Sequence, residues 1–495
     1  MTLATLAAFG AQLLDGFNIL VIVYFVLLNG TYLVMTLLAL GSLRRYALRM
    51  TSVDPNELMS NKGLPPVTLI APAYNEEPIC VESTRSLLTL RYPSYDILVV
   101  NDGSSDGTLA RMIDSFHMEE AARAPVSTLP TQEVRGVYRS TVHPNLWLID
   151  KQNGGKADAL NTGINHCRTP LFCAIDADSL LEPEALTRIV RSFLEDSTTV
   201  AAGGVIRIVN GCKVKAGVVE EVRLPKSFLA RIQVLEYLRS FLAGRMGWDA
   251  IDSTLIISGA FGMFSRQHVA AAGGYRLDTV GEDMDLVVRL HRHCREQEIP
   301  YRVAFVPDPV AWTECPEDTK VLGRQRDRWQ RGLIESLWQN RVMILNPKYG
   351  RIGMVAAPYF FFLEVLGPII ESLGYVTFVA AILLGRASPE YVLAFLAVAF
   401  ALGISLSFAA VGLEELSFRR YPRTRDLIAL MVIAIVENVG YRQLSIWWRV
   451  RGMISMGRGV KTWGAMERKG FASPDETTSS HGPRPRPERP GGRWT

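Results

Sequence analysis

The chain has 495 residues, more than one ordinary domain contains. Hydrophobic residues make up 48% of it and charged residues 21%, so it can bury a large core, and a fully disordered chain is excluded. The net charge of +4 is small for this length, and no basic stripe with interleaved aromatic residues occurs, which argues against nucleic acid as a partner.

The six cysteines are scattered along the chain, and no two of them form a CxxC pair. This spacing argues against a zinc site and against a disulfide scaffold. It suits a reducing compartment for the soluble part of the protein.

The first long apolar run, Gly16–Leu43, contains no charged residue. A helix rises ~1.5 Å per residue, so this run easily spans a hydrocarbon core of ~30 Å. The run is too long for the core of a signal peptide, and no small-residue cleavage site follows it. Arg44 and Arg45 come next, so the positive-inside rule places the following segment in the cytoplasm. We predict a transmembrane helix within residues 1–49 and a polar linker over 50–64.

Between residues 65 and 346, short apolar runs alternate with helical patterns, which predicts an α/β domain with a mostly parallel sheet and helices on both faces. Ligands of such sheets bind beyond the carboxyl ends of the strands. The predicted strands are Val67–Pro72, Ile97–Asn101, Leu146–Asp150 and Leu171–Asp176. The predicted helices are Pro78–Leu90, Ser105–Phe116, Lys156–Cys167 and Pro183–Glu195.

Polar residues follow the first two predicted strands. Tyr74 and Glu76 come after the first, and Asp102 comes after the second, just before a glycine. A carboxylate at the end of a strand can accept hydrogen bonds from a base or a ribose. The alternative is a turn that caps the next helix, and Asp106 is expected to be only such a cap.

Asp176 and Asp178 follow the fourth predicted strand. Strand side chains alternate between faces, so these two carboxylates share a direction while the strand geometry lasts. Neighbouring carboxylates repel each other unless a cation lies between them. Mg²⁺ or Mn²⁺ takes oxygen ligands and bridges phosphate oxygens. The alternative is a cap for the helix that starts near Pro183.

Two further motifs join glycines to charged residues. Asn153–Lys156 opens the third predicted helix, where backbone N–H groups and the lysine could hold an anion, although a plain glycine turn is the alternative. Glu282 and Asp283 precede an amphipathic helix over Met284–His293. Asp283 could be a general base, or the acidic pair could only cap this helix and suit its dipole.

The segment Gln325–Trp329 is basic and aromatic and lies just before the second apolar block. Arginine and tryptophan at this position are common in interfacial helices, where they lie among lipid headgroups. The alternative is a tryptophan that stacks on a sugar and an arginine that binds phosphate.

Three more apolar runs lie towards the other end. Ile352–Leu384 contains two glutamates and two prolines, whereas Tyr391–Leu413 carries no charge. The third run begins at Leu427 and meets Glu437, and a charge inside a bilayer is costly. We expect that the segment with Glu437 or the run broken by prolines does not cross a membrane simply.

The chain therefore has a predicted membrane block of transmembrane and interfacial helices over residues 347–447. A basic juxtamembrane segment is expected over 448–470. Residues 471–495 are rich in Pro, Ser, Gly and Arg and are expected to be disordered.

In this order, the motifs resemble those of the processive membrane glycosyltransferases of family two, which include cellulose, chitin, hyaluronan and poly-N-acetylglucosamine synthases. The resemblance implies a Rossmann-like cytoplasmic domain of the GT-A type, inserted between transmembrane helices. One departure is Gly281, which stands where these synthases usually have threonine. The matching segments are Pro72–Glu77, Asn101–Ser104, Asn153–Lys156, Asp176–Asp178, Ser258–Ala260, Glu282–Asp283 and Gln325–Trp329.

The resemblance also implies roles for individual residues. Asp102 would contact uracil and ribose, and Asp176 and Asp178 would hold the donor diphosphate through Mg²⁺ or Mn²⁺. Asp283 would be the catalytic base, with Glu282 beside it. The implied donor-binding residues are Tyr74, Glu76, Asp102, Lys156, Asp176 and Arg328. The implied acceptor-binding residues are Gln325, Trp329, Ser258 and Gly259.

A segment near the end, which includes Trp463 and Arg468, resembles loosely the Trp-Gly-Thr-Arg element of hyaluronan and chitin synthases. By that resemblance, Arg468 would reach the nucleotide from a gating loop. The alternative is a basic segment that holds anionic lipid.

The implied function is that of an inverting membrane glycosyltransferase that uses a UDP-sugar, best UDP-N-acetylglucosamine or UDP-glucose, to build a β-linked polysaccharide. The expected partners are the UDP-sugar, a growing polysaccharide or lipid-linked acceptor, the bilayer and accessory export proteins. The expected location is a bacterial inner membrane, with the catalytic domain in the cytoplasm. Two alternatives stay open: transfer of a single sugar to a lipid carrier, and a catalytically inactive transport component.

Overall fold

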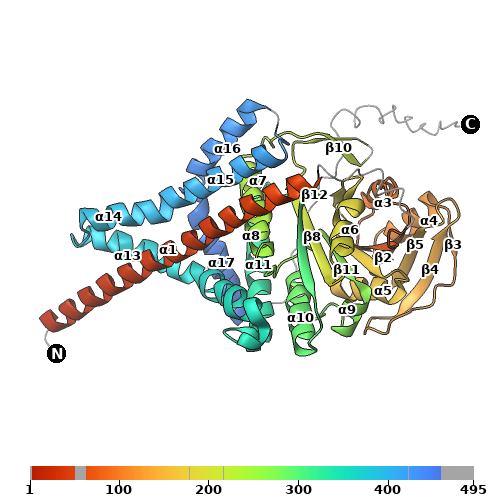
Figure 1. The fold of residues 1–495 in the computed structure, drawn as a ribbon, viewed down its shortest axis with the longest axis horizontal. Coiled ribbons are helices and arrows are strands. Elements are labelled where there is room, and N and C mark those ends of the chain that lie inside the picture. Colours follow the sequence, from red (N-terminus) through yellow and green to blue (C-terminus); the bar gives the residue numbers. More distant parts are fainter. Residues whose placement is uncertain (1–2, 51–62, 178, 216, 422, 459–495) are drawn as a thin grey trace, which may run out of the picture.

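The structure, a computed structural model, describes residues 3–50, 63–177, 179–215, 217–421 and 423–458. An α/β domain lies at one end of the molecule, and an arm of apolar helices extends away from it (Figure 1).

A ten-stranded sheet forms the centre of the α/β domain. Four neighbouring strands, in the order β5-β2-β1-β6, run parallel to one another. They are the four strands predicted from the sequence, and their central residues are buried, as expected for strands covered on both faces. Their bounds are β1 Val67–Ala73, β2 Tyr95–Asn101, β5 Leu146–Lys151 and β6 Leu171–Ile175.

The remaining strands were not predicted from the sequence. The antiparallel strand β11 joins β6 to β8, and β12 runs parallel to β8. The added strands of the sheet are β3 Met118–Glu120, β4 Val134–Ser140, β7 Leu180–Leu181, β8 Thr199–Ile208, β11 Phe261–Ser265 and β12 Arg302–Thr313. A separate hairpin consists of β9 Lys213–Lys215 and β10 Val218–Glu221.

Helices cover both faces of the sheet, which confirms the predicted α/β class. Four of them match the helices predicted between the strands: α3 Cys80–Leu88, α4 Thr108–Ser115, α5 Lys156–His166 and α6 Ala185–Glu195. Side chains of α3, α4, α6 and α7 Phe228–Tyr237 pack in one core cluster, whereas those of α5, α9 Arg266–Ala271 and α10 Glu282–Glu296 pack in another. The polar residues that follow the parallel strands therefore lie at one edge of the sheet, between the two layers of helices.

A connecting region of helices lies between the sheet and the arm. The π-helical turn η1, Leu238–Gly244, and the short helix α8, Arg245–Asp249, continue α7. Helix α11, Thr319–Gln339, follows β12 and begins at Asp318, whose side chain accepts hydrogen bonds from the first helical amides. Two short 3-10 turns, η2 Arg341–Met343 and η3 Pro347–Tyr349, lead from α11 to the apolar helices.

The arm contains α1 packed along α13 and α15 (Figure 1). Two helices are long and apolar enough to cross a membrane, Gln12–Leu48 and Pro389–Ser417. The arm and its base consist of α1 Leu3–Met50, η4 Ile352–Ala356, α12 Ala357–Tyr359, η5 Phe360–Val365, α13 Gly367–Leu383, α14 Pro389–Leu396, η6 Ala397–Ala401, α15 Leu402–Ser417, α16 Thr424–Val436 and α17 Tyr441–Gly457.

Both runs that the sequence marked as irregular are bent. Ile352–Val365 meets α13 at 41°, and α16 meets α17 at 62°. At the second bend, Glu437 accepts hydrogen bonds from Arg239 of η1 at 2.6 Å and from Ser407 of α15 at 3.3 Å. The carboxylate that made this run a poor spanning segment is thus paired with a cation of the connecting region.

Candidate active site

The loops after β1 and β2 are tied together at the carboxyl end of the sheet. Asn75 donates its amide to Ser104 Oγ at 3.0 Å and accepts the Ser105 amide at 2.8 Å. Tyr74, in the first of these loops, is 52% exposed. Asp106 precedes the N-cap residue Gly107; it accepts the amide of Thr108, the first residue of α4, at 3.0 Å and also the amide of Glu77 at 3.1 Å, so it joins the two loops besides supporting the helix start.

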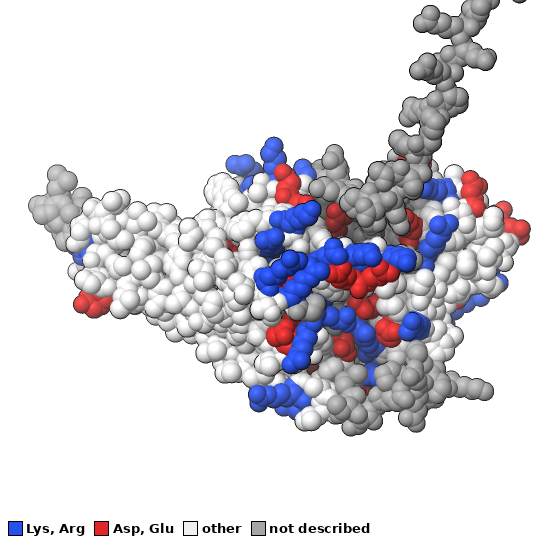
Figure 2. All heavy atoms as spheres, turned by 90° about the horizontal axis from the view of Figure 1, so that it is seen from above, with Lys and Arg blue, Asp and Glu red and all other residues white. Residues whose placement is uncertain are grey.

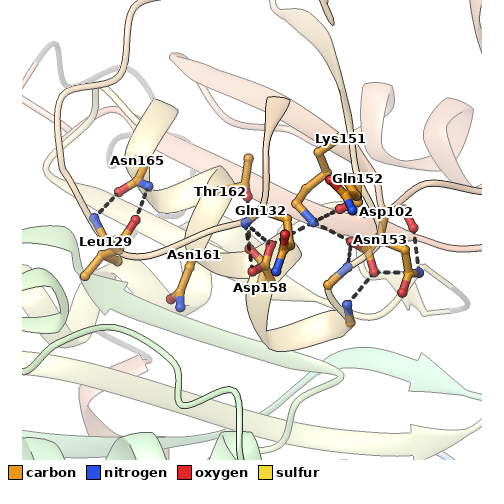
Figure 3. Close-up of polar contacts among 12 residues, drawn as sticks. Asp102, Leu129, Gln132, Lys151, Gln152, Asn153, Asp158, Asn161, Thr162 and Asn165 are labelled. Atoms are coloured by element: carbon orange, nitrogen blue, oxygen red, sulfur yellow. Dashed lines mark hydrogen bonds and ion pairs between the residues drawn. The ribbon is translucent and has the colours of Figure 1, made fainter. Parts of the chain in front are cut away.

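Asp102 is buried and forms the centre of a network between β2 and the start of α5 (Figure 3). Lys151 Nζ lies 2.6 Å from Asp102 Oδ1 and 2.7 Å from Asp158 Oδ1. The amides of Gly154 and Gly155 donate to the two Asp102 oxygens at 3.0 and 2.7 Å. Both oxygens therefore hold the glycine turn in place, and contact of Asp102 with uracil stays a prediction.

Lys151 was not singled out in the sequence, although it directly follows the third predicted strand. Its side chain is fully buried, and its Nζ lies between two carboxylates that both pair with it. Gly103, which directly follows Asp102, has a φ of +64°, and a Cβ there would lie 2.7 Å from the Asn153 amide nitrogen. This close approach explains why the turn after Asp102 needs glycine.

Lys156 is the first residue of α5, and its ammonium group contacts two carboxylates from different segments of the chain. Its Nζ lies 2.5 Å from Asp176 Oδ1 and 3.2 Å from Glu282 Oε1. Burial alone would lower the pKa of Lys156, but the charges of Asp176 and Glu282 outweigh it and raise the pKa well above its ordinary value. The ammonium group is therefore a fixed positive charge at the end of β6.

Asp283 lies beside this cluster in the first turn of α10. Its Oδ2 accepts the Gly259 amide at 3.0 Å, and its Oδ1 accepts the Met284 amide at 2.8 Å. A Cβ on Gly259 would lie 3.1 Å from Lys156 Nζ and 3.4 Å from Asp283 Oδ2. The structure thus brings five of the predicted site residues and positions together, namely Lys156, Asp176, Glu282, Asp283 and the Ser258–Gly259 turn, while the roles assigned to them stay predictions.

The start of α10 and the middle of α11 approach closely. A Cβ on Gly281 would lie 2.7 Å from Gly332 Cα, so a larger residue would push the two helices apart. This contact gives a physical reason for glycine where related synthases usually have threonine. It also brings Asp283 and Trp329 to the same cavity.

Helix α11 places Gln325, Arg328 and Trp329 on the wall of that cavity. Trp329 is 38% exposed, and the Arg326 guanidinium lies 4.5 Å from its ring centroid. Arg326 is held in turn by Glu236 of α7 at 2.5 Å. The Gln325 side-chain oxygen is buried and has no hydrogen-bond partner in the described parts of the chain.

The cavity has a volume of about 510 Å³ and lies between the α/β domain and the apolar helices. Lys156, Asp176 and Asp283 line one part of it. Tyr32 of α1, Glu364 of η5 and Arg449 of α17 line another. Its aromatic lining residues are Tyr32, Tyr237, Phe241, Trp248, Trp329, Tyr359 and Phe360.

The acidic groups at this site suit a hard divalent cation. The Asp176 carboxylate lines the cavity and already lies against one cation, the Lys156 ammonium. No cluster of three or more metal-ligating side chains occurs in the described ranges, so a metal at Asp176 stays a prediction. Asp178, the second predicted ligand, and the predicted gating residues Trp463 and Arg468 lie outside the described residues.

Residues 65–332, more than half of the chain, match the sequence model of glycosyltransferase-like family 2. The chain belongs to this family. Its α/β domain, with a mostly parallel sheet and helices on both faces, has the GT-A type of fold that the resemblance to this family implied.

Two curated relatives match the same region of this glycosyltransferase. The probable glycosyltransferase YdaM of Bacillus subtilis is 28% identical over 273 residues, 55% of this chain and 56% of that protein. The poly-β-1,6-N-acetyl-D-glucosamine synthase of Staphylococcus aureus is 26% identical over 283 residues, 57% of this chain and 58% of that protein. The match thus spans little more than half the length of either relative.

A solved structure also resembles the glycosyltransferase. It is the mannosyltransferase PcManGT from Pyrobaculum calidifontis in complex with GDP-Man and Mn²⁺. The two proteins are 19% identical with a TM-score of 0.47, and the match covers 84% of this chain and 99% of that one.

Proposed function

We propose that this glycosyltransferase is an inverting membrane enzyme that transfers a sugar from a UDP-sugar onto a growing β-linked polysaccharide. The observation that carries the proposal is the cavity, because it joins Asp283, Lys156 and Asp176 to side chains of the apolar helices. An acceptor that reaches Asp283 through this cavity would extend towards the membrane. The similarity to a poly-β-1,6-N-acetyl-D-glucosamine synthase favours UDP-N-acetylglucosamine as donor, with UDP-glucose as the second candidate.

The base of the proposed reaction is Asp283. Two backbone amides orient its carboxylate, which would take the proton of the acceptor hydroxyl. The acceptor oxygen then forms a bond to the anomeric carbon on the face opposite UDP, and the bond to the diphosphate breaks. One such displacement inverts the anomeric configuration, so an α-linked donor yields a β-linked product.

Positive charges near Asp176 would stabilise the departing diphosphate. Lys156 is held at this position by Asp176 and Glu282, and Arg328 faces the same cavity from α11. Asp176 and Asp178 would hold Mg²⁺ or Mn²⁺, which when bound neutralises charge on the diphosphate. Tyr74, Glu76 and Asp102 would receive the nucleoside at the ends of β1 and β2.

The acceptor would lie on the α11 side of the cavity. Trp329 offers an aromatic face for its terminal sugar, and Gln325 and the Ser258–Gly259 turn offer polar groups. Further aromatic rings line the cavity towards the apolar helices, which suits a polymer better than a single sugar carried on a lipid.

The proposed setting is a bacterial inner membrane with the α/β domain on the cytoplasmic side. In the view of Figure 2 the arm shows almost no charged side chains, whereas Lys and Arg gather at its base. This distribution follows the positive-inside rule. The proposed parts are a transmembrane helix over 1–49, a glycosyltransferase domain over 65–346 and a membrane block over 347–447. Accessory export proteins would be its partners there.

Analysis of the products tests the proposal. Membranes that contain the full chain are incubated with a panel of radiolabelled UDP-sugars, and the products are separated by size. A β-linked polymer from one donor is the expected result. A single sugar on a lipid extract would instead support the lipid-carrier function, and no transfer from any UDP-sugar would overturn the proposal.

A further inference from the structure

Arg245 lies in the wall of the cavity and was not singled out by the sequence. It is the first residue of α8, and its guanidinium lies 3.7 Å from the ring centroid of Phe241 and 5.8 Å from that of Phe305. Its Nη1 is buried and has no hydrogen-bond partner within the part of the chain that the structure describes. The stacked ring of Phe241 is thus its main contact.

Four other cations that line the cavity have a carboxylate partner. The pairs are Lys156 with Asp176 at 2.5 Å, Arg239 with Glu437 at 2.6 Å, Arg326 with Glu236 at 2.5 Å and Arg449 with Glu364 at 3.1 Å. Arg245 forms no such ion pair with a described residue, although burial of an unpaired charge is costly.

The Arg245 side chain stays charged despite its surroundings. Burial lowers its pKa to about 10, and the nearby charge of Asp283 opposes this effect only in part. At neutral pH the guanidinium therefore keeps five N–H donors on a planar group, and stacking on Phe241 satisfies none of them. Such a group is suited to oxygen atoms of a molecule that enters the cavity.

The position of Arg245 favours the acceptor over the nucleotide. In the same short helix, Trp248 packs against Tyr359 and Phe360 of the apolar helices, at 5.0 and 5.6 Å between ring centroids. Phe241 in turn stacks on Tyr237 at 4.5 Å, which forms an apolar wall beside the guanidinium. An apolar wall next to a planar donor matches a sugar, which has C–H faces and an equatorial rim of oxygens.

We propose that Arg245 binds the acceptor: its guanidinium donates hydrogen bonds to oxygen atoms of the acceptor's terminal sugar and holds the attacking hydroxyl beside Asp283. This inference rests on the proposed function and adds to it a residue that governs acceptor use. Within the described residues the buried Nη1 has no oxygen partner, and the bound acceptor would supply one.

The test compares donor and acceptor use in Arg245→Gln. The purified full chain is assayed for UDP binding, for release of UDP when water is the only acceptor, and for transfer to a short β-linked oligosaccharide of the sugar that the wild type polymerises. We expect the acceptor KM to rise about 10- to 100-fold, as for loss of a hydrogen bond from a charged donor. UDP binding and UDP release to water should stay close to wild type.

Two further variants sharpen the comparison. Arg245→Lys keeps the positive charge but loses the planar guanidinium group with its several N–H donors, so its acceptor KM should rise less than that of Arg245→Gln. Arg231→Gln on α7 removes an arginine that does not line the cavity and that donates through Nε to the Pro225 carbonyl, so it should behave like wild type.

An unchanged acceptor KM in Arg245→Gln, or a selective loss of UDP binding, would overturn the inference. If that variant does not fold, Arg245→Lys is measured in the same way, and a wild-type acceptor KM there would also overturn it. A wild type that uses no UDP-sugar at all would instead refute the proposed function, so the two failures can be told apart.

Discussion

Asp283 is oriented by two backbone amides rather than by another side chain, and this arrangement leaves its carboxylate directed to the cavity. Asp283→Asn keeps the size of the side chain but removes the base. We expect transfer to fall about 10²–10⁴-fold, while UDP binding is retained. Initial rates of transfer and a UDP-binding titration on the purified variant check this expectation.

Asp283→Glu is a suitable companion variant, because it keeps the carboxylate and shifts only its position. It should retain more activity than Asp283→Asn. Transfer by Asp283→Asn at nearly the wild-type rate would show that another group takes the proton.

Lys151 illustrates how one buried charge can hold a binding loop. Its removal in Lys151→Met would leave the Asp102 and Asp158 carboxylates buried without their shared cation. Breaking a buried pair in this way costs about 3–5 kcal/mol, so we expect a clear drop in the unfolding temperature and loss of donor binding. Thermal unfolding in detergent measures the first effect, and UDP titration measures the second.

Lys215→Met is the control for this prediction, because the Lys215 side chain is 71% exposed and lies in the separate β9–β10 hairpin. Its unfolding temperature should match that of the wild type. Equal stability of Lys151→Met and Lys215→Met would mean that the Asp102 network does not hold the Gly154–Gly155 turn.

At the scale of elements, α11 carries both a proposed donor-binding residue and a proposed acceptor-binding residue. Arg328 and Trp329 are neighbours in sequence and both line the cavity. If Trp329 supports the acceptor sugar, Trp329→Ala misplaces the hydroxyl near Asp283, and a shift of ~1 Å costs on the order of 10²-fold in rate. Arg328→Ala should instead weaken use of the diphosphate donor. Separate KM values for donor and acceptor distinguish the two variants.

Trp338→Ala provides a control on the same helix. Trp338 is 55% exposed and does not line the cavity, so its loss should leave both KM values unchanged. If Trp329→Ala and Arg328→Ala elongate acceptor like the wild type, α11 is an interfacial anchor and the active-site placement of its motif is wrong.

At the scale of the whole molecule, polar contacts connect the α/β domain and its neighbouring helices to the arm. Arg207 of β8 pairs with Glu414 of α15 at 2.6 Å, and both side chains are buried. Arg449 of α17 pairs with Glu364 of η5 and donates to Gln330 of α11 at 2.9 Å. The helix that carries Trp329 is thus attached to the apolar helices, so the cavity between the two parts has a fixed wall.

If Asp176 and Asp178 hold a divalent cation together with the donor diphosphate, as proposed, transfer depends on that cation. We expect EDTA to stop transfer by the full chain and Mg²⁺ or Mn²⁺ to restore it. Zn²⁺ should not replace them, since no His and Cys cluster is present among the described residues. Full activity after chelation and removal of metal would contradict this prediction.

The alternation of strands and helices from Val67 to Glu195 was predictable, because each parallel strand is a short apolar run and each covering helix has its own periodicity. The positions of the motifs were predictable for the same reason, since the carboxyl ends of parallel strands share an edge. Strands β8, β11 and β12 were not assigned, because their pairing depends on segments far away in the sequence and their buried runs carry no alternating pattern.

By itself, the sequence determined the α/β class and the apolar segments, which follow from local patterns, whereas the grouping of residues around Asp283 was implied only by the resemblance of the motifs to a known family. Only the tertiary structure decided which charges are compensated. In the sequence, three basic residues look alike: Lys151, Arg239 and Arg245. In the fold, Lys151 lies between two carboxylates and Arg239 pairs with Glu437, whereas Arg245 forms no ion pair with any described residue. Their difference arises from partners that the fold brings within about 3 Å, because the cost of a buried charge depends on its three-dimensional surroundings and not on its neighbours in the chain.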